Sequence, residues 1–299
     1  MISYRLNGQR ISLKLPDATK QEMDFLDTSF FAANPGRRLP TPSEIRALSK
    51  NDKSAQPKPI FIEDLNLVVK FGPFVTAVEA LNLWMVRHIF HDKVPVPDVF
   101  GWRIDDRGSG FIYMELIPGP TIHDCYDTLT DGQKQTICDQ LREVLKTLRQ
   151  LRQDPEDQFV GSINRQHLSD YVFIDQPRGG PFPSVEAFND WFALLHQLRF
   201  QHRYEDPNRC LLPDNRDITF THTDLHRGNI IITSFNPLQI AIVDWQQSGW
   251  YPDYWEYCKL LYTCSYEDEW RIKFIDTFLQ PDPDVHLVFS DYTMAMGAV

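Results

Sequence analysis

The chain has 299 residues and carries 30 Lys and Arg against 41 Asp and Glu, a formal net charge of −11. Hydrophobic residues make up 42% and aromatic residues 13% of it, as in chains that bury a sizeable core and unlike disordered segments. This length suits two domains or one two-lobed unit. The acidic balance argues against a general nucleic-acid or anionic-membrane binder, since such proteins use Lys and Arg to neutralise phosphates.

The five cysteines are widely spaced and include no C-x-x-C pair. They indicate reduced thiols of an intracellular protein rather than a disulfide framework or a zinc site. The N-terminal segment lacks the apolar run of a signal peptide, and no stretch approaches the roughly 18 uncharged apolar residues of a transmembrane helix. We therefore expect a cytoplasmic protein without nucleic-acid or membrane partners; the sequence leaves its oligomeric state open.

The first 59 residues predict strands and loops. Alternating polar and apolar residues flank Asn7-Gly8, and this dipeptide takes the positive φ angles of a type I′ turn, so residues 1 to about 15 are expected to form a hairpin. Residues 33–59 are rich in Pro, Ser, Lys and Asn. We expect mostly loop there, with one short helix at residues 42–49.

Strand and helix signals follow one another in the next segment. Residues 60–71 predict two strands, broken near residues 64–66. A helix is predicted after them, because four apolar residues recur at spacings of 3, 4 and 4 along one helix face: Val78, Leu81, Met85 and Ile89. Pro95 and Pro97 are expected to end this helix.

A division into two lobes is predicted near the middle of the chain. A strand at residues 111–116 runs into the breaker cluster Pro118-Gly119-Pro120, which is well placed as a hinge. We therefore expect a β-rich N-lobe over residues 1–116. The C-lobe, residues 117–299, is expected to be mainly helical, which together predicts an α+β bilobal fold.

Three helical segments are predicted in the second half of the chain. Thr130 and Gln133 form a capping-box pattern before apolar residues at helical spacing up to Leu151. Another helix is expected from Ser184 to about residue 200, and residues 254–279 read as mainly helical. Short strands are expected at 220–221, 229–233 and 239–244.

The densest polar group of the chain lies at residues 222–229, where Asp224 is followed five residues later by Asn229. Asp244 ends the strand that follows, fifteen residues after Asn229. Phosphoryl transfer from ATP requires this set: one carboxylate to orient the attacking hydroxyl and accept its proton, and an amide oxygen and a second carboxylate to hold Mg²⁺. Lys70 on a strand and Glu79 on the following helix would supply the phosphate anchor and its partner.

At this point the sequence resembles the aminoglycoside-phosphotransferase-like kinases, which share the two-lobed protein-kinase fold with choline kinases. It looks closest to the fungal branch of that family, and the resemblance spans residues 60 to about 275. The residues that carry it are Val69-Lys70-Phe71-Gly72 with Glu79-Ala80, Val94-Pro95-Val96-Pro97, Tyr113-Met114-Glu115 with Gly119, Gly180-Pro181-Phe182, the loop 222–229, Asp244-Trp245 and residues 249–256.

The resemblance implies an ATP- and Mg²⁺-dependent small-molecule kinase. Its N-lobe would bind the nucleotide, and its C-lobe would carry the catalytic loop and the acceptor site. Asp224 would be the catalytic base, Asn229 and Asp244 the metal ligands, and Lys70 the phosphate anchor held by Glu79. The acceptor would be a hydroxyl of a small molecule, and residues 164–213 are the candidate region for binding it.

Further roles follow from the same resemblance. Backbone groups of the hinge would bind adenine, at Glu115, Leu116 and Ile117. Glu256 falls where the family has an acidic residue that braces the catalytic loop, although Asp253 could be aligned there instead.

Three basic residues of the loop 222–229 have less defined expectations. His222 is expected to be structural, through hydrogen bonds within the loop. His226 and Arg227 are equally compatible with contacts in the substrate pocket and with ordinary polar positions at the surface.

Two other functions stay open at this stage. No G-x-G-x-x-G or G-x-x-x-x-G-K-[ST] motif precedes Lys70, so a kinase-fold protein that binds nucleotide without turnover is the first alternative. The spacing His222-x-Asp224-x-His226 suggests a zinc-dependent hydrolase, but the sequence offers no further cluster to complete a zinc shell. The aromatic residues between Trp245 and Trp255 could form a cage for a cationic substrate, and packing is the more common use of such residues.

Overall fold

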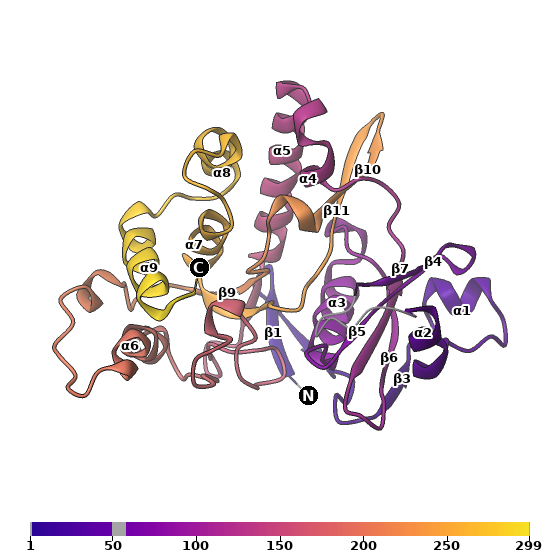
Figure 1. Ribbon diagram of the computed structural model, residues 1–299, viewed down its shortest axis with the longest axis horizontal. Coiled ribbons are helices and arrows are strands. Elements are labelled where there is room, and N and C mark those ends of the chain that lie inside the picture. The colour runs from indigo at the N-terminus through magenta and orange to yellow at the C-terminus, as the bar shows by residue number, and fades with distance from the viewer. Residues whose placement is uncertain (1, 50–57, 299) are drawn as a thin grey trace. The chain divides into compact units, whose positions relative to one another are not determined.

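The computed structural model describes residues 2–49 and 58–298 (Figure 1). The chain divides into two compact units. We call Leu15–Asp124 with Ile230–Gln246 the β-rich unit, and Met1–Lys14, Cys125–Asn229 and Gln247–Val299 the helical unit. Within the described ranges, no helix is long and apolar enough to cross a bilayer.

The β-rich unit is built on an antiparallel five-stranded sheet with the strand order β3-β6-β7-β5-β4. Its strands are β3 (Glu22–Asp24), β4 (Ile60–Ile62), β5 (Leu67–Gly72), β6 (Val99–Ile104) and β7 (Gly110–Glu115). The register pairs Lys70 on β5 with Ile112 on β7. Lys70 therefore lies on an inner strand, opposite β7 and one residue beyond the last pair between β5 and β4.

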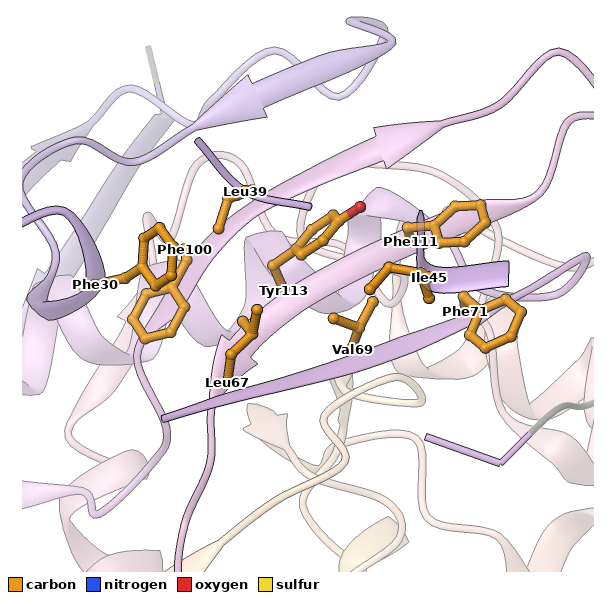
Figure 2. Close-up of a cluster of buried hydrophobic side chains, with 9 residues drawn as sticks. All are labelled: Phe30, Leu39, Ile45, Leu67, Val69, Phe71, Phe100, Phe111 and Tyr113. Atoms are coloured by element: carbon orange, nitrogen blue, oxygen red, sulfur yellow. The ribbon is translucent and has the colours of Figure 1, made fainter. Parts of the chain in front are cut away.

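Three helices accompany this sheet: α1 (Ser29–Ala33), α2 (Pro42–Leu48) and α3 (Ala77–Phe90). One hydrophobic cluster joins α1 and α2 to the strands (Figure 2), and its side chains point toward one another. Its members are Phe30, Leu39, Ile45, Leu67, Val69, Phe71, Phe100, Phe111 and Tyr113. Helix α3 packs against β6 and β7. The buried cluster fixes the strand that carries Lys70.

The hairpin formed by β10 (Ile230–Phe235) and β11 (Leu238–Ile242) also belongs to the β-rich unit. Its backbone is tied to that unit because Ile232 N–H donates to Pro120 O at 2.9 Å and Ile242 N–H donates to Pro95 O at 2.8 Å. At Gly119, which has φ +128°, a Cβ atom would lie 2.1 Å from Ile232 O. A glycine is required there, because no side chain fits against the hairpin.

The helical unit contains two small sheets and most of the helices (Figure 1). The strands are β1 (Ile2–Leu6), β2 (Gln9–Leu13) and β8 (Leu151–Gln153) in one sheet, and β9 (Ile218–Thr221) and β12 (Gly249–Pro252) in the other. The helices are α5 (Asp131–Leu148), α6 (Val185–Leu195), α7 (Trp255–Tyr262), α8 (Ile275–Phe278) and α9 (Pro283–Met296); α4 (Ile122–Cys125) lies at the boundary of the two units.

Aromatic side chains fill the core of the helical unit. Trp255 stacks on Tyr251 and Phe173 at ring-centroid distances of 5.5 and 5.6 Å. Phe188 meets the ring of Trp255 edge-on at 5.1 Å. The aromatic residues between Trp245 and Trp255 are all buried, so they pack in the interior and form no exposed cage.

Several predicted elements are confirmed. The hairpin at Asn7-Gly8, the break in the strands at residues 63–65, and helix α3 are present. Thr130 and Gln133 make the predicted capping box at the start of α5. Helix α6 begins after Ser184, whose side chain accepts a hydrogen bond from Ala187 N–H. Of the loop expected over residues 33–59, residues 50–57 lie outside the described residues.

Other elements were not predicted. Strand β6 is buried along almost its whole length and contains Gly101, so it lacks the polar and apolar alternation of a half-buried strand. Strands β3, β8 and β12 are short, and α9 begins at Pro283, in the Pro-rich segment 281–283. The unit boundaries also differ from the expected division after residue 116. The N-terminal hairpin joins the helical unit because β1 pairs with β8, and β10–β11 joins the β-rich unit through the hydrogen bonds described above.

Candidate active site

The loop that contains Asp224 starts where β9 ends, in the helical unit. Thr223 adopts a left-handed conformation with φ +67°, and a 3-10 turn at Arg227–Asn229 closes the loop. The side-chain nitrogen of Asn229 donates to the Asp224 carboxylate at 3.0 Å and to the Asp224 carbonyl at 2.8 Å. These bonds hold the two predicted catalytic-loop residues together.

Glu256, in the first turn of α7, binds the backbone of this loop. Its carboxylate accepts hydrogen bonds from His222 N–H at 2.7 Å and from Thr223 N–H at 3.1 Å. Its side chain is only 4% exposed, and this burial raises its pKa to about 7, against the opposing effect of the two N–H donors. Asp253 instead has a carboxylate oxygen 3.8 Å from Arg216. Of the two acidic residues considered from the sequence, Glu256 is the one that contacts the loop.

The basic residues of the loop make local contacts. His222 Nδ1 accepts a hydrogen bond from Asp224 N–H at 3.2 Å. His226 Nδ1 accepts one from Gly228 N–H at 3.0 Å, and its Nε2 lies 3.8 Å from the Asp224 carboxylate. Arg227 is paired with a carboxylate of the same unit, as described below.

Lys70, Glu79 and Asp244 come together within the β-rich unit. The Lys70 ammonium lies 3.1 Å from a carboxylate oxygen of Glu79 and 2.7 Å from one of Asp244. Burial lowers the pKa of Lys70, but the two carboxylates outweigh it and raise the pKa above its ordinary value. Burial raises the pKa of Glu79 to about 7, although Lys70 counteracts this effect. The predicted ion pair is therefore present in the structure, with Asp244 as a third member.

Asp244 follows β11 in a left-handed conformation with φ +62°. The next residue is anchored on α3, since Asn82 donates from its side chain to Trp245 O at 2.8 Å. Asn82 lies three residues after Glu79 and is fully buried. Sequence reasoning missed it, although a polar residue within the apolar face of a helix, one turn after Glu79, was a usable signal.

The segment 115–117 is the predicted adenine-binding hinge. Glu115 N–H donates to Asp98 O at 2.8 Å, and Leu116 N–H donates to Asn66 O at 3.1 Å. The Glu115 carboxylate also accepts a hydrogen bond from Asp98 N–H at 3.2 Å. Two N–H groups of the segment thus bond to neighbouring backbone of the β-rich unit.

Each of the two units supplies a side-chain oxygen of the kind that suits a hard cation. Asn229 uses its amide nitrogen for both bonds to Asp224, so its amide oxygen can serve as a ligand. The carboxylate of Asp244 is about one-third exposed, and its cationic neighbour is a lysine that a metal ion could replace. Amide and carboxylate oxygens are the ligands that suit Mg²⁺. No group of three or more His, Cys, Asp or Glu in residues 2–49 and 58–298 is arranged to hold a metal ion, so the geometry gives the zinc-site hypothesis no support.

Comparisons with known proteins identify a family for the chain. The model of the phosphotransferase enzyme family (APH) matches residues 60–286, more than half of the chain. The structure of a mutant aminoglycoside 2'-phosphotransferase-IIIa in complex with GDP matches with a TM-score of 0.50 at 17% identity, covering 90% of this chain and 85% of that chain.

Two further solved structures are similar. The apo form of a thermostable mutant of aminoglycoside phosphotransferase APH(4)-Ia has a TM-score of 0.49 at 14% identity, over 80% of each chain. Aminoglycoside phosphotransferase APH(3'')-Id from Streptomyces rimosus has a TM-score of 0.44 at 15% identity, over 80% of this chain and 92% of that chain. No curated protein matches the chain.

The likeness to the GDP complex confirms the predicted α+β, protein-kinase-like fold. The fungal branch stays a prediction. Because the family model covers residues 60–286, the chain belongs to the phosphotransferase enzyme family.

Proposed function

We propose that the protein transfers the γ-phosphoryl group of ATP to a hydroxyl group of a small molecule, with Mg²⁺ as the cofactor. The observation that carries this proposal is the contact of Lys70 with both Glu79 and Asp244 inside one compact unit. Membership of the phosphotransferase enzyme family supports it. A solved protein with the same fold is a complex with GDP, which supports nucleotide binding.

Lys70 is the proposed phosphate anchor. Glu79 has no exposure to solvent, so it cannot leave its position easily and holds the lysine by charge. In the structure, the anionic carboxylate of Asp244 contacts Lys70 at the position proposed for an anionic phosphate oxygen. Nucleotide phosphates would replace Asp244 at Lys70, which releases the carboxylate for another cation.

The metal would be held by the amide oxygen of Asn229 and the carboxylate of Asp244. When bound, Mg²⁺ neutralises the phosphate charge that develops during transfer. Asp224 would accept the proton of the acceptor hydroxyl. The bonds from Asn229 fix the orientation of that carboxylate before the acceptor arrives, and this order reduces the cost of reaching the reactive geometry.

Adenine would bind along the hinge at residues 115–117, with Ile117 N–H as the backbone donor. The acceptor would be bound by residues 164–213, which lie in the helical unit. This region includes the buried carboxylate of Asp170, which pairs with Lys259 at 2.6 Å.

The experiment is a thermal-shift titration with ATP in the presence and absence of Mg²⁺, followed by measurement of ADP formation with a panel of small-molecule alcohols. We expect a stabilising shift that needs both ATP and Mg²⁺, together with acceptor-dependent ADP formation. A shift without turnover of any acceptor would favour the nucleotide-binding alternative. The absence of any shift with ATP would refute the proposal.

A further inference from the structure

Arg227 lies between Asp224 and Asn229 in the catalytic loop and is held by two groups of the helical unit. Its guanidinium donates to the carboxylate of Asp268 at 2.5 Å. The guanidinium carbon also lies 4.3 Å from the ring centroid of Tyr126, a cation–π distance. We call these contacts the Arg227 clasp.

The clasp is supported by a second layer of contacts. The hydroxyl of Tyr126 donates to the Glu269 carboxylate at 2.9 Å, and Lys134 lies 2.8 Å from the same carboxylate oxygen. Hydrogen bonds from Lys134, Lys273 and Tyr126 lower the pKa of Glu269 to about 2. Glu269 is therefore ionised at every pH at which the protein would be assayed, and it keeps the ring of Tyr126 in place.

These contacts decide between the two expectations for Arg227. Asp268 and Tyr126 occupy the guanidinium, and both Arg227 and Asp268 have side chains less than one-fifth exposed. A partly buried pair of this kind is screened less by solvent than a surface pair. The guanidinium of Arg227 thus faces Asp268 and Tyr126 of the helical unit, so Arg227 is suited to holding the loop.

Holding Arg227 constrains the chain between the two reactive side chains. It is the first residue of the 3-10 turn that ends at Asn229, and it follows Asp224 by three residues. Glu256 anchors the start of the loop at His222 and Thr223. Within the loop the bonds are short-range: His226 N–H donates to Asp224 O, and Asn229 N–H donates to His226 O, both at 2.9 Å. Such bonds set the shape of the loop, whereas Arg227 ties that shape to segment 268–269.

We propose that Arg227 is a positioning residue, which, through Asp268 and Tyr126, keeps Asp224 and Asn229 in the arrangement that transfer requires. This inference rests on the proposed function for its kinetic consequence. Its structural consequence is independent of turnover, since loss of the clasp frees the catalytic loop whether or not the protein is an active enzyme.

The test compares Arg227→Gln, Asp268→Asn and the double variant with the unaltered protein. Asp139→Asn is the matched control, because Asp139 pairs with Arg142 on α5 of the same unit and Arg142 keeps its bond to Thr277 O when Asp139 is replaced. Hydrogen exchange of the peptide 222–229 reports on the loop. The kcat and the affinity for MgAMP-PNP report separately on catalysis and nucleotide binding.

We expect faster exchange in peptide 222–229 for both single variants and not for Asp139→Asn. We expect kcat to fall by roughly 10- to 100-fold, as displacement of a catalytic group by about 1 Å does, with nucleotide affinity within about threefold. The kcat of the double variant should be no lower than that of the more impaired single variant, because both changes break the same interaction. Arg227→Lys keeps the charge and should recover part of kcat.

Unchanged exchange in peptide 222–229 for Arg227→Gln would overturn the inference, and so would a double variant whose kcat loss is the product of the two single losses. If Arg227→Gln does not fold, Arg227→Lys and Asp268→Asn carry the same comparison. A protein without turnover would refute the proposed function, while the exchange measurement would still decide whether the clasp holds the loop.

Discussion

Replacement of Glu256 by Gln is predicted to remove a pH dependence from the stability of the fold. In the folded protein the pKa of Glu256 is raised to about 7 by burial, whereas an exposed glutamate has an ordinary value near 4.5. The folded state thus binds the proton more tightly than the unfolded state. The stability that this group contributes is fully present below pH 4.5 and is lost as the pH rises through 7.

The magnitude follows from the difference between the two pKa values. At about 1.4 kcal/mol per pKa unit, the free energy of unfolding falls by on the order of 3 kcal/mol on account of Glu256 between pH 4.5 and pH 8. Glutamine resembles the protonated acid and does not titrate. We therefore expect Glu256→Gln to match the unaltered protein near pH 5 and to exceed its stability at pH 8.

The assay is urea unfolding at pH 5, 6, 7 and 8, followed by the fluorescence of the buried tryptophans. Glu143→Gln is the control, since Glu143 is exposed and 3.5 Å from Lys146. The difference in stability between Glu256→Gln and the unaltered protein should change by on the order of 3 kcal/mol over this range. A difference that stays constant with pH, or an unaltered protein that gains stability relative to Glu256→Gln as pH rises, would refute the reasoning.

Three further substitutions test the β-rich unit. Lys70→Met leaves the buried carboxylate of Glu79 without its cation and should cost about 3 to 5 kcal/mol of stability, and also abolish the MgAMP-PNP shift; a retained shift would contradict the anchor role. Asn82→Ala removes the bond to Trp245 O and should cost about 1 to 3 kcal/mol by urea unfolding, so an unchanged midpoint would contradict it. Gly119→Ala places a Cβ 2.1 Å from a carbonyl oxygen of the neighbouring strand and should lower Tm by several degrees, corresponding to more than about 1 kcal/mol; an unaltered Tm would be inconsistent with this contact.

The residues of the site that were predictable from the sequence are those whose spacing reflects local structure. Asp224 and Asn229 share one short loop, so their five-residue separation already implied that they meet. Lys70 and Glu79 lie on adjacent elements, and strand and helix signals placed them near each other. Asp244 was found because it follows a recognisable hairpin strand.

The contacts that were missed connect distant parts of the chain. Asp268 reaches Arg227 over 41 positions, and Asn82 reaches Trp245 over 163 positions. Neither residue belongs to a sequence motif, because the role of each side chain depends on the distant segment against which it packs. The N-terminal hairpin was predicted as an element, but its pairing with β8 depends on a sheet partner almost 150 residues away.

Strand β6 shows why regular patterns can fail as well. Its side chains are buried on both faces of the sheet, so no alternation distinguishes it from a buried helix segment. Gly101 inside it looks like a strand breaker in the sequence. In the structure, a Cβ atom at that position would lie 2.1 Å from Met23 O, so the glycine permits the close approach of strand β3.

ADP formation from MgATP by the unaltered protein and by Asp224→Asn, with an acceptor from the alcohol panel, tests the central claim most directly. Asparagine keeps the size of the side chain and cannot accept the acceptor's proton. We predict that both proteins show the same MgAMP-PNP thermal shift and that Asp224→Asn forms ADP at least about 100-fold more slowly. Full acceptor-dependent turnover by Asp224→Asn would contradict the account.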